Sequence, residues 1–107
     1  MLSHLKTSLQ NSIWNWVVYR IHIMVSGKVQ RVWFRKQTQA KALELGLTGW
    51  VKNFFSYAVE IIAEGSMDSL TELTGWLQDG PPLAKVEKLS IEWFPGKNEF
   101  FFFEIVK

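Results

Sequence analysis

The sequence of 107 residues contains no cysteine and only two histidines. The missing thiols exclude disulfide scaffolds, thiol nucleophiles, thiolate zinc sites and iron–sulfur clusters. Long apolar runs are missing too. The longest uncharged stretch near the N-terminus, Thr7 to Tyr19, has 13 residues and contains three amide side chains, whereas a bilayer span needs about 20 apolar residues. It also lacks the clean apolar run of a signal peptide. We therefore expect a cytoplasmic protein without a membrane segment.

Acidic residues are missing from the first 43 positions. This part carries seven basic residues, a charge of +7, while the rest carries five lysines against ten carboxylates, a charge of −5. The basic part presents a field that suits an anion, although it does not require a polyanion. With 48% hydrophobic and 21% charged residues, the chain has the composition of one globular domain and not of a disordered or collagen-like protein.

Hydrophobic periodicity predicts seven elements of secondary structure. They are strands over 19–26, 47–53, 58–64, 86–94 and 100–106, a helix from Phe34 that stops at Gly46, and a helix that Ser66 caps and Gly80-Pro81-Pro82 terminates. This order predicts an α+β fold, the ferredoxin-like split βαβ sandwich (βαββαβ plus a terminal strand), with two helices on one face of an antiparallel sheet.

Two details of this prediction concern side chains. In the last strand, we expect Phe101, Phe103 and Ile105 to form the buried face. Alternation along the strands also indicates that their glutamates face solvent and form no catalytic carboxylate pair: Glu60, Glu64 and Glu92.

Residues 1–18 precede this plan as an N-terminal extension, so the domain itself spans residues 19–107. The extension has apolar residues at helical spacing (Leu2, Leu5, Leu9, Ile13 and Trp16). It is expected either to pack as a helix or to fray, and a targeting peptide is the weaker alternative because Lys6 is its only charged residue.

The segment that carries chemistry leaves the first strand and enters the first helix: Gly27-Lys28-Val29-Gln30-Arg31-Val32-Trp33-Phe34-Arg35. Unpaired N–H groups and the positive end of the dipole make such a helix start an anion site. Arg35, on the first helical turn, offers a planar fork of donors to phosphate oxygens. Spacing alone leaves open whether the segment binds an anion or only connects two elements.

This segment resembles the acylphosphatase signature, glycine-x-valine-glutamine-glycine-valine-x-phenylalanine-arginine. The segment Gly49-Trp50-Val51-Lys52-Asn53 resembles the second motif of that family. The resemblance extends over residues 20–107. It implies a hydrolase without metal or cofactor that cleaves the carboxyl–phosphate bond of a small-molecule acylphosphate to give a carboxylate and inorganic phosphate.

The resemblance also implies residue roles. Arg35 and Asn53 are the expected catalytic residues: Arg35 holds the phosphate and Asn53 positions the attacking water. The expected phosphate-binding residues are Gly27, Lys28, Val29, Gln30, Arg31, Val32 and Arg35. An acylphosphate has a good leaving group, so positioning and charge stabilisation are the main tasks of the protein.

Two positions depart from the family pattern. Arg31 replaces the glycine of the signature, and if that position needs a positive φ, a residue with a Cβ costs about 1–2 kcal/mol there. The Arg31 side chain then either fills the phosphate cradle or adds a second cation to it. In the predicted hairpin, Ser56-Tyr57 replaces the usual aspartate-glycine pair, which predicts a strained or longer turn.

Two alternatives to an active, monomeric acylphosphatase remain open. The departures and the N-terminal extension suit a catalytically weakened relative that binds an anion or a protein partner. The split βαβ plan also serves RNA-binding domains. The sequence lacks the basic-glycine-aromatic string of such domains on a central strand, so we expect no nucleic-acid partner.

Overall fold

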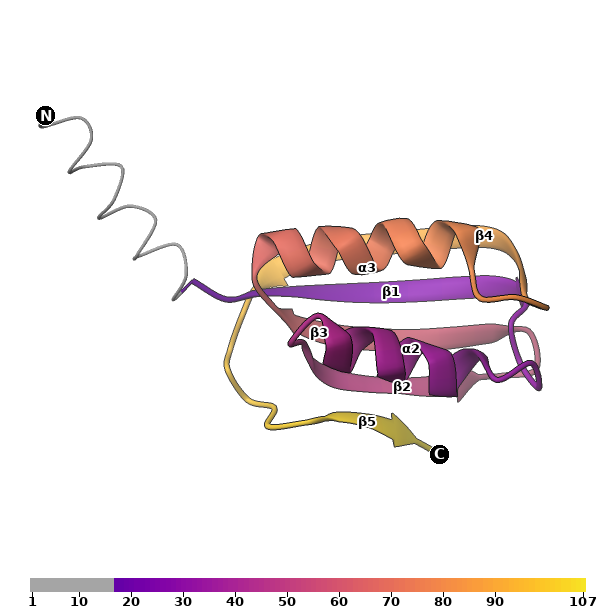
Figure 1. Cartoon of the computed structure of the whole chain (residues 1–107), viewed down its shortest axis with the longest axis horizontal. Coiled ribbons are helices and arrows are strands. Elements are labelled where there is room, and N and C mark those ends of the chain that lie inside the picture. The colour runs from indigo at the N-terminus through magenta and orange to yellow at the C-terminus, as the bar shows by residue number, and fades with distance from the viewer. Residues whose placement is uncertain (1–16) are drawn as a thin grey trace, which may run out of the picture.

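The computed structural model describes residues 17–107 (Figure 1). The predictions for the N-terminal extension therefore fall almost entirely outside the described residues. The elements follow in the order β1 (Tyr19–Lys28), α2 (Phe34–Glu44), β2 (Thr48–Phe54), β3 (Ala58–Gly65), α3 (Met67–Asp79), β4 (Lys85–Pro95) and β5 (Phe103–Val106). This order is the predicted βαββαβ plan with one terminal strand.

The five strands form one sheet in the order β4-β1-β3-β2-β5. β1 pairs antiparallel with β3 and β4, and β2 pairs antiparallel with β3. The edge strand β5 pairs parallel with β2, so the predicted ferredoxin-like sheet is mixed at this edge and not antiparallel there. The reason is the connection from β4, which crosses to the opposite edge of the sheet and brings β5 back in the direction of β2.

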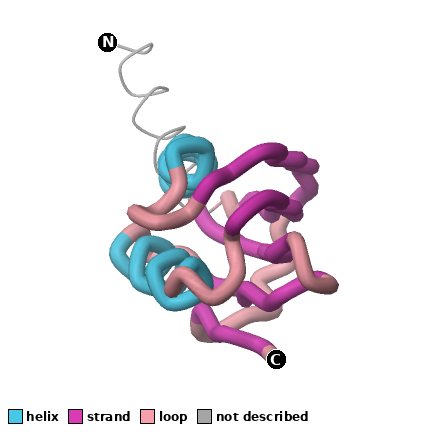
Figure 2. The backbone as a smooth tube through the Cα atoms, turned by 90° about the vertical axis from the view of Figure 1, so that its right-hand side faces the viewer, coloured by secondary structure: helices cyan, strands magenta, loops and turns pink. Residues whose placement is uncertain are grey.

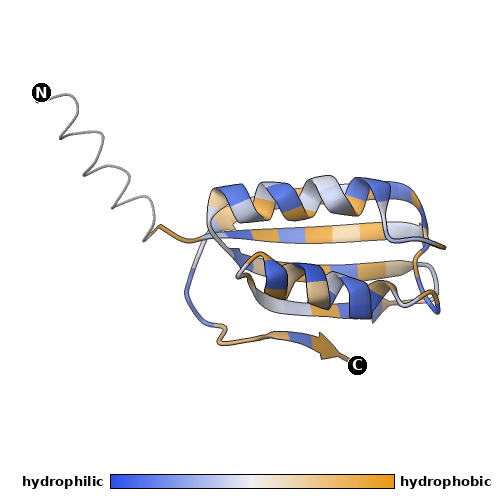
Figure 3. Ribbon diagram, in the orientation of Figure 1, coloured by the Kyte–Doolittle hydropathy of each residue, from blue (hydrophilic) through white to orange (hydrophobic). Residues whose placement is uncertain are grey.

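Both helices cover the same face of the sheet, which gives a two-layer sandwich (Figures 1 and 2). Apolar and polar residues alternate along β1 (Figure 3), because successive strand residues point to opposite faces. The apolar set meets the leucines of α3 and the inner stripe of α2 in one core. Its fully buried members include Ile21, Ile23, Val25, Leu70, Leu73 and Leu77. As predicted, the side chain of Ser66 caps α3 by accepting a hydrogen bond from Ser69 N–H at 3.2 Å.

The start of the last strand differs from the prediction. Phe101, expected to be buried, is 87% exposed, and β5 begins only at Phe103, which is 2% exposed. Four successive phenylalanines satisfy an alternating pattern in any register, so the pattern cannot locate the strand start. Residues 96–102 are used instead for the connection between the two edges of the sheet, where Phe102 O accepts a hydrogen bond from Gly49 N–H at 2.8 Å.

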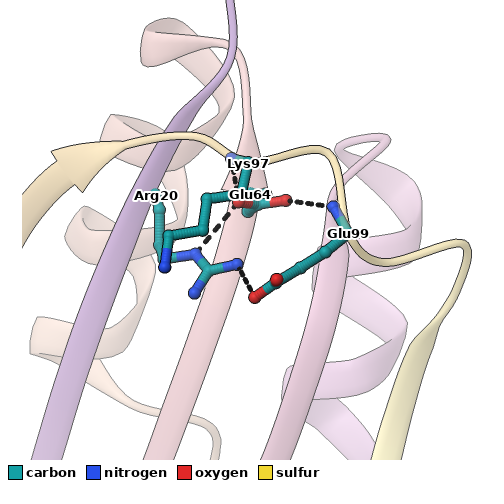
Figure 4. A network of polar contacts seen from close by, with 4 residues as sticks. All are labelled: Arg20, Glu64, Lys97 and Glu99. Atoms are coloured by element: carbon teal, nitrogen blue, oxygen red, sulfur yellow. Dashed lines mark hydrogen bonds and ion pairs between the residues drawn. The ribbon is translucent and has the colours of Figure 1, made fainter.

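Glu64 also differs from the prediction, since it is 1% exposed and not solvent-facing. The connection between β4 and β5 passes over it, and its carboxylate accepts hydrogen bonds from Arg20 Nε at 3.0 Å and from Lys97 N–H at 2.7 Å (Figure 4). Glu99 N–H also donates to it at 3.4 Å, and the Glu99 carboxylate pairs with Arg20 Nη2. This buried acid therefore fastens the connection across the end of the sheet.

The pKa values of this group follow from these contacts. Partial burial alone lowers the pKa of Arg20, but the hydrogen bonds to Glu99 and Glu64 outweigh it and raise the pKa. The hydrogen bond from Arg20 lowers the pKa of Glu99 below its usual value. Both shifts favour the charged forms at neutral pH.

Among residues 17–107, no helix has the length and apolarity needed to cross a membrane.

Candidate functional site

The residue before the last of β1, just ahead of the loop, is a glycine that the fold requires. Gly27 has φ +125°, and a Cβ at this position would lie 2.3 Å from the carbonyl oxygen of Lys85. Its N–H donates to Tyr57 O in the hairpin between β2 and β3 at 3.0 Å. A hydrogen bond to the β2–β3 hairpin therefore holds the chain in place where it leaves the sheet. Because the Gly27 N–H makes this bond, it is not free to bind an anion.

Gln30 makes the second attachment to the same hairpin. Its Nε2 donates to the carbonyl oxygens of Phe55 and Ala58, each at 2.7 Å. Phe55 follows β2 by one residue and Ala58 begins β3. The family resemblance implied a phosphate-binding role for Gln30. Its side chain is instead occupied in holding the loop against the hairpin, which leaves its backbone N–H as the group for an anion.

The loop turns tightly between Gln30 and α2. Arg31 has φ +62° and Trp33 has φ +64°, while the intervening Val32 has no positive φ. The positive φ that we considered for Arg31 is thus confirmed. Residues with positive φ on either side of one without it bend the loop sharply, and tight loops of this kind turn successive N–H groups toward one concave side that binds anions. In the described part of the chain, the N–H groups of residues 30–33 donate to no backbone carbonyl.

α2 begins directly after this loop with free N–H groups of its own. Trp33 stands at the N-cap position, and no side chain among the described residues makes a capping hydrogen bond there. The first turn contains Arg35 and Lys36 and no acidic residue. The positive end of the helix dipole, the free N–H groups and two cations therefore act in the same place.

A cavity of about 470 Å³ opens at this junction. It is lined by Val29, Gln30, Arg31, Trp33, Phe34, Arg35, Lys36 and Ile105. Within residues 17–107, none of the ion pairs involves one of its three cations, Arg31, Arg35 and Lys36. The cavity therefore has a positive charge that no carboxylate in the described part of the chain neutralises through an ion pair.

Asn53 does not line the cavity itself, but it lies one step beyond it along the sheet. It is an exposed residue of β2 that pairs with Val59. Two residues earlier on the same strand face, Val51 pairs with Ile105 of β5, which lines the cavity. Alternation along β2 places Asn53 on the helix-covered face of the sheet, toward the end where the loop is attached.

The structure thus brings four of the predicted residues, Val29, Gln30, Arg31 and Arg35, to one cavity, with Asn53 beside it. Lys28 is exposed at the end of β1 and Val32 is buried, and neither lines the cavity.

Sequence reasoning missed the other lining residues. Lys36 had a signal, because it follows Arg35 in the first helical turn. Ile105 had none, since only the parallel pairing of β5 with β2 brings it here.

The hairpin that anchors the loop has the strain predicted for its turn. The turn occupies residues 55–57, and Phe55 has φ +53°, a conformation that costs a residue with a Cβ about 1–2 kcal/mol. Phe55 and Tyr57 are exposed, and their rings stack with centroids 6.4 Å apart. The strained residue is Phe55, one position before the Ser56-Tyr57 pair at which the sequence placed the departure.

Among residues 17–107, no three histidine or acidic side chains come close enough together to hold a metal ion.

Comparison with known proteins identifies the family of this chain. The family model described as Acylphosphatase matches residues 21–105. The acylphosphatase of Methylococcus capsulatus is 43% identical over 88 residues, covering 82% of this chain and 96% of that protein. The solved structure of an acylphosphatase from Coxiella burnetii has a TM-score of 0.79 at 43% identity and covers 84% of this chain and 94% of its own. That of Bacillus subtilis has a TM-score of 0.80 at 35% identity, covering 83% and 99%. The chain therefore belongs to the acylphosphatase family of enzymes.

Proposed function

We propose that this enzyme hydrolyses acylphosphates to a carboxylate and inorganic phosphate, with the phosphoryl group bound in the cavity at the start of α2. One observation carries the proposal: the unneutralised cation Arg35 lines a cavity at a helix start whose N–H groups have no cap. A phosphoryl group there accepts hydrogen bonds from the loop and helix N–H groups and from the planar guanidinium of Arg35. The members of the family to which the chain belongs are named for this activity.

The chemical step needs few groups from the protein. A water oxygen attacks phosphorus, the bond between phosphorus and the acyl oxygen breaks, and the carboxylate leaves with the electron pair. The water proton passes to an oxygen of the phosphoryl group. The side chain of Asn53, beside the cavity, orients this water without adding a negative charge that would repel the phosphate.

Charge stabilisation comes from fixed groups in this proposal. The phosphoryl oxygens gain charge in the transition state, and preorganised N–H donors and a guanidinium offset that charge without needing to reorganise. Arg35, Lys36 and the helix dipole all contribute positive potential at the same point. The reaction is therefore expected to proceed without a divalent metal ion.

The test is release of inorganic phosphate from benzoyl phosphate by the purified full chain in the presence of a chelator. Arg35→Ala and Asn53→Ala are compared with the parent, with folding checked by circular dichroism. We expect turnover by the parent and losses of about 100-fold or more for Arg35→Ala and about 10- to 100-fold for Asn53→Ala, because each removes a positioning or charge-stabilising contact. Turnover that chelator abolishes would contradict the metal-independent mechanism.

A second candidate function is favoured by Arg31, which lies in the cavity in a strained conformation. In this alternative, the chain binds an anion or a protein partner and has lost most of its turnover. The same assay separates the two functions, since a weakened relative binds inorganic phosphate in calorimetry but releases none above the uncatalysed rate.

The monomeric state, the cytoplasmic location and the absence of a nucleic-acid partner stay predictions from the sequence. Light scattering of the eluted protein tests the first.

A further inference from the structure

Arg31 stands where the acylphosphatase signature has glycine, and the structure places its side chain at the proposed site. It is an exposed residue that lines the same cavity as Arg35. Its φ of +62° is a conformation that glycine adopts at lower cost. Among residues 17–107, its guanidinium takes part in none of the ion pairs. An unpaired cation is thus held at the cavity in a backbone conformation that disfavours it.

The phosphoryl group does not need this additional charge. Arg35, Lys36 and the uncapped start of α2 already supply cations and N–H donors to one anion. The rest of the lining includes apolar side chains, among them those of Trp33 and Ile105, which suit the carbon skeleton of an acyl group. The positive charge of Arg31 therefore exceeds what binding of the phosphoryl group requires. Its side chain is available to contact the acyl part of the substrate.

We propose that Arg31 is a specificity-determining residue that binds a carboxylate on the acyl part of the substrate, so that the enzyme prefers monophosphorylated dicarboxylic acids to acylphosphates with an uncharged acyl group. The proposal rests on the proposed function. A guanidinium presents a planar fork that matches a carboxylate, and one additional cation matches one additional anion. We expect the charged acyl group to raise kcat/KM about tenfold, which is the effect of one charge-assisted contact at an accessible site.

The test compares two substrates that differ by one charge, 4-carboxybenzoyl phosphate and 4-carbamoylbenzoyl phosphate. The measured quantity is the ratio of their kcat/KM values, because loss of a cation weakens binding of any anion and only the ratio reports contact with the second group. We expect a ratio of about 10 for the parent and about 1 for Arg31→Gln and Arg31→Gly, a tenfold loss from one contact. Arg31→Lys retains part of the ratio because it keeps the charge.

Two controls make the result specific. Lys97→Gln removes one positive charge at the opposite end of the sheet, two residues after Pro95, which pairs with Tyr19. This variant should keep the parent ratio. Arg31→Gly contains the glycine of the family signature and relieves the positive φ, so it tests the proposal even where Arg31→Gln folds poorly. An equal ratio in the parent, Arg31→Gln and Arg31→Gly would overturn the proposal while the proposed function stands.

A binding measurement separates this proposal from the proposed function. Calorimetry gives the Kd values of 4-phosphonobutyrate and its amide, 4-phosphonobutyramide, neither of which can turn over. If the parent hydrolyses neither 4-carboxybenzoyl phosphate nor 4-carbamoylbenzoyl phosphate, the proposed function fails. Tighter binding of the carboxylate, lost in Arg31→Gln, would then still support the assignment of Arg31, and equal Kd values would overturn it.

Discussion

The side-chain amide of Gln30 and the backbone carbonyl of Phe55 lie 2.7 Å apart, although 25 positions separate the two residues in the sequence. The same Nε2 reaches Ala58 O at 2.7 Å, and Gly27 N–H reaches Tyr57 O at 3.0 Å. These bonds join the loop of the cavity to the hairpin that ends the strand of Asn53. The geometry between the phosphate donors and the water-orienting residue of our proposal therefore depends on Gln30.

Gln30→Ala removes both side-chain hydrogen bonds, and we expect it to lower kcat/KM for benzoyl phosphate about 10- to 100-fold, because small displacements of positioned groups have large kinetic effects. Gln39→Ala is the matched control, since Gln39 Nε2 makes a similar bond to Phe103 O at 3.0 Å away from the hairpin. Equal losses in the two variants would show that Gln30 has no special role in positioning the loop. The pH profile should keep its shape, because Gln30 does not titrate.

Arg31→Gly should increase the free energy of unfolding by about 1 kcal/mol, because glycine removes the cost of a Cβ at φ +62°. Part of this stabilisation is offset because glycine also raises the conformational entropy of the unfolded chain. For a domain of this size, that gain raises Tm by about 4–8 °C. Lys28→Gly, at an exposed strand position without positive φ, should lower stability by about 0.5–1 kcal/mol. Urea denaturation of both variants measures the two effects, and a less stable Arg31→Gly would contradict the assignment of strain.

Asn53→Asp should be less active at neutral pH than Asn53→Ala. A carboxylate beside the phosphate repels it, whereas alanine only removes the contact with water, so we expect a further loss of about tenfold in kcat/KM. The difference should shrink as the pH falls toward the ordinary aspartate pKa of about 4, where the side chain becomes neutral. Kinetics between pH 4 and 8 test this, and identical profiles for the two variants would place Asn53 too far from the phosphate for the proposed role.

Glu99 should contribute to stability in a pH-dependent manner. Its hydrogen bond from Arg20 lowers its pKa in the folded state below the ordinary value of 4.5. The contribution is therefore fully present above that value and is lost as the pH falls through the lower folded pKa. Glu99→Gln should flatten the loss of stability below pH 5, and 0.5 M salt should reduce the effect because Glu99 is exposed.

The control is Glu104→Gln, which removes an exposed carboxylate of β5 that takes part in no ion pair among residues 17–107. In chemical denaturation at several pH values, Glu104→Gln should lose unfolding free energy at acid pH to the same extent as the parent. A parallel change in both variants would assign the effect to net charge and not to the contact with Arg20.

Local sequence signals determined the elements. The alternation through Ile21 and Ile23, the cap at Ser66 and the terminating Gly80 act over a few residues, and the structure confirms the strands and helices that they predict. The two motifs likewise identified the loop before α2, the helical Arg35 and the strand of Asn53, because each motif is contiguous in the chain. Element order then limits the fold to the split βαβ plan, since short connections leave few ways to pack two helices on one sheet.

Tertiary structure alone decided everything that depends on the connection from β4 to β5. Whether Phe101 or Phe103 begins the strand, whether Glu64 faces water or lies beneath a crossing chain, and whether Ile105 reaches the cavity all depend on where that connection lies. The same is true of the bonds from Gln30 to the hairpin. Periodicity reports which face of an element is apolar, but burial of a polar group and contact across distant segments are set by what packs over that face, which no local pattern encodes.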